Sequence, residues 1–305
     1  MQNSSSYEYR LERFRRVKDS WGLELVHALF AKYHMPKHNL KDLRDAVSLY
    51  IARALQFPHT YDEDQLIQRI NKNRDHRTNI TPNGGIVPKF EYQLEYNMVL
   101  RAWAQLVRGM IKDDVSLLRK FRLTPNIRIK FAKELEDNMN RGLSTSHPHS
   151  DAWVEGGWGI NCFVPIFGDC VGNTLEYYVL KDESMFSDSF LEMAETYTEM
   201  QWVLDYYELS DTVIPDKGYL HLSDYALIHN TRRDERCETR VSIDTTIFIG
   251  DHDLHDDRRI EYLETVPKVG EEILITTTRS IYDPPSEKKS VFSHYTSGAL
   301  KIHKL

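Results

Sequence analysis

The chain has 305 residues, of which 41% are hydrophobic and 28% charged, and its formal net charge is −7. This composition is too apolar for a disordered chain and too poor in glycine and proline for a fibrous one. No apolar run approaches the roughly 18 residues that a membrane helix needs, and the first residues lack the basic and apolar blocks of a signal peptide. The three cysteines, Cys162, Cys170 and Cys237, form no paired framework, so we expect a reduced, cytoplasmic protein.

Charge is distributed unevenly along the chain. Residues 1–150 carry a net positive charge and residues 151–305 a net negative one. The basic residues of the first half are interleaved with acidic ones, and aromatic-plus-basic RNA motifs are absent. We therefore expect two halves that attract each other within one body, with neither a nucleic-acid nor a membrane partner.

Residues 1–123 are predicted to form a helical N-terminal region that packs on the core. Apolar residues at helical spacing make one stripe over residues 25–33 and another over residues 43–55. Pro36 separates the two stripes, and Asn39 is the expected N-cap of the second helix.

Three more elements complete this region. Residues 60–63 have the form of a capping box, which predicts a short helix ending at Ile70. Residues 71–89 are polar and broken by proline and glycine, which indicates a loop. A long helix is predicted over residues 94–121.

From Pro125 onwards the hydrophobic period changes from helical to alternating. Short strands rich in β-branched and aromatic residues are predicted at 126–131, 158–167, 173–180, 219–222, 225–229, 239–250 and 271–278. Such strands indicate a sandwich or barrel, and with the preceding helices an α+β fold. We assign residues 124–250 to a β core and residues 251–305 to a C-terminal extension.

Residues 185–209 interrupt this core and are rich in aromatic side chains, which predicts a helical insertion. A large aromatic surface on an insertion packs on the core, on a partner subunit or over a site. We expect it to cover the substrate entrance, with a homodimer interface as the alternative.

The most informative stretch is the HPHSD sequence that ends at Asp151. Residues two apart in an extended segment face the same side, so His149 and Asp151 can bind one metal ion. His229 follows far downstream, at the end of a predicted strand. Two histidines and one carboxylate make the facial triad of non-haem Fe(II) oxygenases, which leaves positions open for cosubstrate and O₂. With 13 histidines in the chain, a surface histidine beside an aspartate is the alternative interpretation.

Arg240 and Ser242 add a second feature downstream of His229. A guanidinium beside a hydroxyl suits a carboxylate, because arginine forms bidentate, charge-assisted hydrogen bonds. The alternative is an ion pair at a strand edge with Glu238 or Asp244. The combination of both features is much less expected by chance than either one.

With these residues the sequence resembles the Fe(II)- and 2-oxoglutarate-dependent oxygenases, whose pattern is HxD…H followed by Arg-x-Ser. The stretches HSDAWVEGGWGINCFVPIFGDCVGNTL and HNTRRDERCETRVSID resemble the branch that contains the streptomycin-biosynthesis oxygenase-like proteins, related to phytanoyl-CoA dioxygenases. The resemblance covers roughly residues 126–250.

This resemblance implies a double-stranded β-helix core, which is a jelly-roll of the cupin type. It also implies Fe(II) held by His149, Asp151 and His229, with 2-oxoglutarate on the iron and O₂ as the other cosubstrate. Arg240, assisted by Ser242, would bind the C5 carboxylate of 2-oxoglutarate.

Other histidines compete for the same roles. If His147 were paired with His149, the pair would lack a carboxylate on the matching side of the segment. We therefore expect His147 not to be a metal ligand. His221 is also followed by an arginine, Arg232, but that arginine falls in a charged loop, and we prefer His229. The acidic, histidine-containing segment 251–257 could suggest a second metal site, although a solvated loop is the favoured interpretation.

The C1 carboxylate of the cosubstrate has no clear receptor in the sequence. Asn161 and Cys162 alternate on a strand, so one of the two faces the cavity. Asn161 is a candidate donor to this carboxylate, and Thr174 on the next strand is another.

The residue types also bear on the reaction. Family members that halogenate replace the carboxylate of the triad with glycine or alanine, whereas Asp151 is present here. Hydroxylation, or another oxidation such as desaturation, epoxidation or ring closure, is therefore favoured, with release of succinate and CO₂. Family analogy suggests a small, polar, sugar- or natural-product-like metabolite. The alternatives are a cupin-type metal enzyme that does not use O₂, a protein hydroxylase and a silent binding module.

Overall fold

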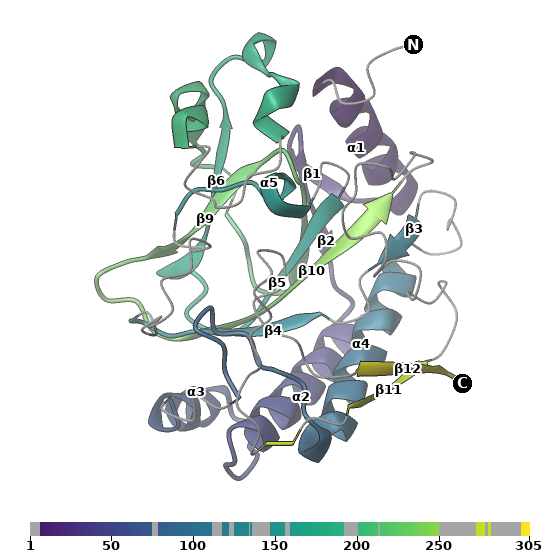
Figure 1. The fold of residues 1–305 in the computed structure, drawn as a ribbon, viewed down its shortest axis with the longest axis vertical. Coiled ribbons are helices and arrows are strands. Elements are labelled where there is room, and N and C mark those ends of the chain that lie inside the picture. Colours follow the sequence, from purple (N-terminus) through teal and green to yellow (C-terminus); the bar gives the residue numbers. More distant parts are fainter. Residues whose placement is uncertain are drawn as a thin grey trace.

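The computed structural model describes residues 7–74, 79–111, 118–121, 125–133, 135, 147–155, 159–191, 201–212, 214–249, 273–277, 280–281 and 300–305. These residues form helices and antiparallel sheets, which confirms the predicted α+β class. Figure 1 shows two helices, α2 (Lys37–Ala54) and α4 (Gln93–Ile111), along one side of the long central strands. Two strands, β6 (Asn173–Leu180) and β9 (Ile228–Arg233), lie toward the other side. None of the helices within these ranges is long and apolar enough to cross a membrane.

Four α-helices come from the N-terminal third: α1 (Tyr7–Trp21), α2 (Lys37–Ala54), α3 (Glu63–Lys72) and α4 (Gln93–Ile111). A short 3-10 helix, η1 (Phe90–Tyr92), leads into α4. The buried faces of α2 and α4 pack together, with Tyr50 of α2 against Tyr96 of α4. Trp103 of α4 and Phe14 of α1 are fully buried in the same apolar core, which continues to the large sheet.

The predicted helix over residues 25–33 is wrong. Those residues form a hairpin of β1 (Glu24–His27) and β2 (Phe30–His34), and β2 pairs with β8. Gly22, at φ 64°, ends α1 in the left-handed conformation that favours glycine. In so short a segment, the spacing of the apolar residues fits a helix as well as a strand. The segment forms strands because β2 pairs with a neighbouring strand of the sheet.

Helix boundaries differ from the sequence pattern at three places. Helix α2 begins directly after Pro36, and Asn39 is buried inside it instead of capping it. Asp62, not Thr60, caps α3 by accepting a hydrogen bond from the Gln65 amide at 2.8 Å. Helix α4 ends at Ile111, and residues 118–121 form a strand instead of continuing the predicted long helix.

The large sheet has the strand order β1-β2-β8-β5-β10-β3, and β4 also pairs with β10. Its remaining strands are β3 (Leu118–Phe121), β4 (Asn126–Lys130), β5 (Gly159–Gly168), β8 (Tyr219–Asp224) and β10 (Arg240–Ile249). A smaller sheet has the order β7-β6-β9, with β6 (Asn173–Leu180), β7 (Tyr207–Leu209) and β9 (Ile228–Arg233). A separate hairpin of β11 (Ile273–Thr277) and β12 (Leu300–Lys304) is hydrogen-bonded to α4 through Asn97.

Most predicted strands are found close to their expected positions. The exception is the strand predicted at 225–229: residues 225–227 form the turn after β8, and β9 begins at Ile228. The backbone amide of Leu227 donates to the carbonyl of Asp224 at 3.0 Å and closes this turn. Strand β8 therefore ends later, and β9 begins later, than the alternation of apolar residues indicates.

The insertion between β6 and β8 is not a single helix in its described parts. It contains the 3-10 helices η2 (Glu183–Met185), η3 (Asp188–Leu191) and η4 (Gln201–Tyr206), followed by β7. The side chains of Asp182 and Ser187 accept hydrogen bonds from nearby backbone amides, which competes with a regular helix. Residues 192–200, with the predicted apolar Met193, Tyr197 and Met200, lie outside the described residues. The segment 251–257 also lies outside them.

Candidate metal centre

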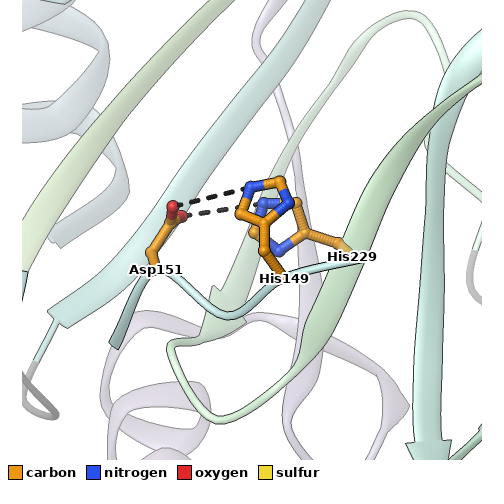
Figure 2. Close-up of side chains that lie close together, drawn as sticks. All are labelled: His149, Asp151 and His229. Atoms are coloured by element: carbon orange, nitrogen blue, oxygen red, sulfur yellow. Dashed lines mark ion pairs between the residues drawn. The ribbon is translucent and has the colours of Figure 1, made fainter. Parts of the chain in front are cut away.

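Two chain segments bring the candidate ligands together. The segment that contains His149 pairs with β9, and the backbone amides of His149 and His229 each donate to the other's carbonyl, at 2.9 and 2.8 Å. The two residues are thus directly opposite each other, which puts both imidazoles on one face. A short helix, α5 (Ala152–Glu155), follows and turns the chain toward β5. Asp151 lies at this turn and points back at both rings (Figure 2).

The three side chains form a compact donor set. The distance from His149 Nε2 to Asp151 Oδ1 is 4.0 Å, and from His229 Nε2 to Asp151 Oδ2 it is 3.7 Å. One ligand atom from each residue lies within 4.8 Å of the others. Divalent first-row metals bind such nitrogens and oxygens at about 2.0–2.2 Å, so one ion between the three atoms can contact all of them.

Backbone carbonyls orient the imidazoles for metal binding. His149 Nδ1 lies 2.7 Å from the carbonyl of His147, and His229 Nδ1 lies 3.4 Å from the carbonyl of Leu227. A proton on Nδ1 serves these contacts and leaves Nε2 as the ligand atom. Burial, and then the neighbouring His229, hold the pKa of His149 well below its ordinary value. His149 is therefore neutral, which is the form that binds a metal.

The Asp151 carboxylate is held by β5. The amide of Asn161 donates a hydrogen bond to Asp151 Oδ2. Cys162, the next residue, is buried in the apolar core, so Asn161 is the one of the pair that faces the site. An amide donor to a coordinating carboxylate fixes its direction and leaves the other oxygen available.

Several residues that support the centre were not predicted from the sequence. Ser150 donates its hydroxyl to the carbonyl of Tyr225, and Trp153 Nε1 donates to the carbonyl of Phe190 at 2.6 Å. Tyr177 of β6 is opposite His229, with ring centroids 5.8 Å apart. No motif marks these residues, since their role depends on strand order.

Arg240 is buried, at 1% exposure, on β10. One terminal nitrogen donates to the carbonyl of Asn173 at 2.9 Å, and the guanidinium lies 5.2 Å from the ring centre of Phe163. Burial lowers the pKa of Arg240 to about 10, so it is charged at neutral pH. Within the described ranges, Arg240 has no ion pair, and its Nε and the hydroxyl of Ser242 have no hydrogen-bond partner.

The alternative interpretation of Arg240 as an edge-strand ion pair is thus not supported. Asp244, its expected partner, is bound by Arg128 instead, with Nη2 to Oδ2 at 2.5 Å. Among the described residues, the Nε of Arg240 and the hydroxyl of Ser242 have no partner, which leaves hydrogen-bonding capacity for an anion. Ser242 lies on the same face of β10 as Arg240, because the two are two residues apart.

The triad and Arg240 face the same space between the two sheets. Asn161, which contacts Asp151, and Phe163, which contacts Arg240, are two residues apart on β5 and so share one face. The triad and Arg240 are therefore both next to this face of β5.

Thr174 is placed differently. Thr174 and Tyr177 are three residues apart on β6, so their side chains lie on opposite faces of the strand. Tyr177 is on the face that meets His229, and Thr174 is on the other face. Its hydroxyl is buried and reaches no partner among the described residues. The strand register argues against Thr174 as a donor at the metal centre.

The competing histidines are accounted for by their contacts. His147 is exposed, and its carbonyl serves His149. His221 Nε2 accepts a hydrogen bond from the Asp216 amide at 3.0 Å, and its Nδ1 lies 3.3 Å from the Phe163 carbonyl. Burial lowers the pKa of His221 to about 3, and with both nitrogens bonded it is a neutral structural residue.

Comparison with known proteins gives a remote likeness to one class of enzyme. No protein-family model matches the chain, and no curated protein matches it. Among solved structures, the non-haem α-ketoglutarate-dependent epimerase SnoN of nogalamycin biosynthesis is 15% identical, with coverage of 78% of this chain and 82% of that chain and a TM-score of 0.38.

Two further structures show the same level of similarity. AviO1 from Streptomyces viridochromogenes is 12% identical, with coverage of 79% of this chain and 94% of that chain and a TM-score of 0.41. An N-substituted L-amino acid dioxygenase from Burkholderia ambifaria is 11% identical, with coverage of 79% and 91% and a TM-score of 0.37. Because the likeness is remote, the assignment of a function depends on the residues of the site.

Proposed function

We propose that this protein is a non-haem Fe(II)- and 2-oxoglutarate-dependent dioxygenase that hydroxylates or otherwise oxidises a small polar metabolite. The observation that carries the proposal is the pairing of two features in one space. A neutral His149, with Asp151 and His229, supplies a three-ligand metal site, and the buried Arg240, which lies over the ring of Phe163, supplies a carboxylate receptor on the same face of β5. Either feature alone fits other functions, whereas both together fit a dicarboxylate bound to a metal.

The donor set fits the two groups that the proposal requires. Two imidazole nitrogens and one carboxylate oxygen on one side are the ligands that Fe(II) takes in oxygenases, and they leave the opposite side open. The unpartnered Nε of Arg240 and the hydroxyl of Ser242 suit the distal carboxylate of 2-oxoglutarate. When bound, these groups would supply oxidising chemistry with O₂, in which one oxygen atom of O₂ enters succinate as CO₂ is released and the other is available to the substrate.

The protein's own residues orient the three candidate metal ligands and bury the groups that would bind the metal and the cosubstrate. Asn161 holds one oxygen of Asp151, and the carbonyls of His147 and Leu227 set the direction of the two imidazoles. His149 and Arg240 are almost completely buried, at 2% and 1% exposure. Charge-assisted hydrogen bonds are stronger in such surroundings than in water.

We further infer that the two sheets form a double-stranded β-helix. In support, β6 and β9 form a small antiparallel sheet that the segment with His149 extends, and the long strands β5, β8 and β10 form a larger one. The candidate ligands come from the small sheet, and their supporting residue Asn161 comes from the large one. We infer from this arrangement that the metal centre lies between the two sheets.

Binding of 2-oxoglutarate to the Co(II)-loaded protein tests the proposal. Arg240→Met removes the buried charge and should weaken binding by at least about 30-fold, since truncating one partner of a buried charged pair costs about 2–5 kcal/mol. The matched control is Arg232→Met, because Arg232 is 37% exposed and is paired with Asp234. Calorimetric titration of each variant with 2-oxoglutarate measures the difference.

The same titration distinguishes the alternative. A cupin-type metal enzyme that does not use a dicarboxylate has no need for Arg240. Equal affinities of the wild type and Arg240→Met, with metal binding intact, would remove the reason for preferring an oxygenase. A loss of affinity in Arg232→Met would mean that the receptor has been misplaced.

A further inference from the structure

A buried ionic cluster connects the first helix to the strand that precedes β9. Asp224, the last residue of β8, has no exposed surface. Arg10 Nη1 lies 2.5 Å from its Oδ1, and Arg13 Nη2 lies 2.7 Å from its Oδ2. The backbone amide of Ala226 also donates to Oδ1, at 2.8 Å. Helix α1 and the turn after β8 are thus both bonded to one carboxylate.

A buried ionic cluster of this kind contributes little net stability to the folded state. The loss of hydration on burying charges can exceed their mutual attraction, and apolar residues of similar size are often as stable. Burial by itself raises the pKa of Asp224, but Arg10 and Arg13 outweigh burial and hold that pKa below its ordinary value. The carboxylate is ionised, and its donors fix the direction of both oxygens.

The turn that Asp224 holds touches both parts of the metal centre. The backbone carbonyl of Tyr225, the next residue, accepts a hydrogen bond from the hydroxyl of Ser150. Ser150 lies between His149 and Asp151 in the chain. The amide of Leu227 donates to the carbonyl of Asp224 at 3.0 Å, and the carbonyl of Leu227 faces His229 Nδ1 at 3.4 Å. One hydrogen bond therefore joins the residue after Asp224 to the segment of His149 and Asp151, and two successive contacts lead from Asp224 through Leu227 to His229.

We propose that Asp224, held by Arg10 and Arg13, is a positioning residue for the metal centre. It fixes the turn 225–227 so that the carbonyls of Tyr225 and Leu227 keep the ligand segments at the separation that a metal requires. Helix α1 is then part of the site's support as well as of the core. The inference rests on the proposed function in one respect, namely that the triad binds a divalent metal.

Titration of the metal-free, full-length protein with Co(II) tests this role through the visible absorption of the bound ion. Asp224→Asn keeps the size of the side chain and an acceptor for Ala226 but removes the charge. Its dissociation constant for Co(II) should rise by about tenfold or more, as for other supporting residues of metal sites. The shape of the absorption spectrum should also change, because the ligand geometry changes.

Two further variants separate positioning from simple destabilisation. Val17→Ala loosens α1 by removing buried methyl groups without touching the turn, and should bind Co(II) like the wild type. Arg10→Lys keeps the charge but loses the planar fork, and should give a smaller rise in the dissociation constant with an unchanged fold. Arg10→Lys also carries the test if Asp224→Asn does not fold.

The outcomes are distinct. Co(II) affinity and spectra of Asp224→Asn and Arg10→Lys that equal those of the wild type would overturn the positioning role and leave the proposed function intact. An equal weakening in Val17→Ala would also overturn it, because any loosening of α1 would then suffice. A wild-type protein that binds no Co(II) would instead refute the proposed function.

Discussion

Asn161 is the residue on which the direction of the Asp151 carboxylate depends, through a hydrogen bond between their side chains. Asn161→Ala should weaken the binding of Co(II) about 10–100-fold, the usual effect of losing a partner that orients a ligand. Asn97→Ala is the matched control, because the Asn97 amide bonds the backbone of β11, on the separate hairpin that packs on α4. Titration with Co(II) measures both. Unchanged affinity in Asn161→Ala would show that Asp151 needs no such support.

The sequence predicted the triad better than its surroundings. His149 and Asp151 share a face because of their spacing along an extended segment, which is a local property. The sequence favoured His229 over His221 because Arg232 was expected in a charged loop, but Arg232 lies on β9. The contacts give the better reason, since both ring nitrogens of His221 are already bonded. Asn161 was expected to contact the cosubstrate, and its bond to Asp151 depends on how β5 lies beside the ligand segment.

At the scale of elements, the start of β5 packs directly against the turn 225–227, which contacts the segments of the candidate metal ligands. A Cβ on Gly159 would lie 2.2 Å from the ring of Tyr225, which is fully buried. Gly159→Ala should therefore lower the free energy of unfolding by about 1–3 kcal/mol through overpacking. Gly109→Ala, in α4, meets its nearest atom at 3.9 Å and should stabilise the protein by up to about 1 kcal/mol. Denaturant unfolding that showed no difference between the two variants would contradict the packing described here.

Strand positions were predicted well where one face is buried and the other is polar. Residues 173–180 match β6 fully, and residues 239–250 enclose β10. The hairpin at 24–34 was mistaken for a helix, because a segment this short fits both periods and is decided by its pairing with β8. The prediction of a single helix in the insertion was wrong for a related reason. Hydrogen bonds between side chains and the nearby backbone compete there with a regular helix. That the insertion covers the substrate entrance stays a prediction.

At the scale of the whole molecule, Glu63 joins the helical region to the large sheet. Its carboxylate accepts hydrogen bonds at 2.8 Å from Arg44, from Lys217 and from the amide of Gly168. Burial alone would raise the pKa of Glu63, but these donors lower it to about 2. The unfolded chain therefore binds a proton at higher pH than the folded one, and stability falls as the pH drops from about 4.5 to about 2.

Glu63→Gln should remove this dependence. At neutral pH the variant should be less stable by about 1–3 kcal/mol, and the difference should shrink through the same pH range. Glu95→Gln is the control, because its partner Arg53 is 61% exposed and such pairs contribute about 0–1 kcal/mol. Unfolding curves at a series of pH values measure the effect. A constant difference between wild type and Glu63→Gln at every pH would contradict the assigned pKa.

The order of helices followed by antiparallel strands was predictable, whereas the order of strands within the sheets was not. Helical and alternating periods are local signals, but β8 pairs with β2 and β5 across long stretches of chain. The charge asymmetry between the halves has a structural counterpart in the Arg10–Asp224 and Arg128–Asp244 pairs, in which the first half supplies the cation and the second half the anion. The homodimer and the substrate remain predictions.

The formation of succinate from 2-oxoglutarate is the measurement that tests the central claim most directly. The purified protein should convert 2-oxoglutarate to succinate in the presence of Fe(II) and O₂, slowly without its substrate and faster with it. His149→Ala removes one of the three protein ligands and should abolish this conversion, while His147→Ala, at an exposed position, should retain it. No succinate from the wild type, or equal amounts from the wild type and His149→Ala, would contradict the assignment of an Fe(II)- and 2-oxoglutarate-dependent dioxygenase.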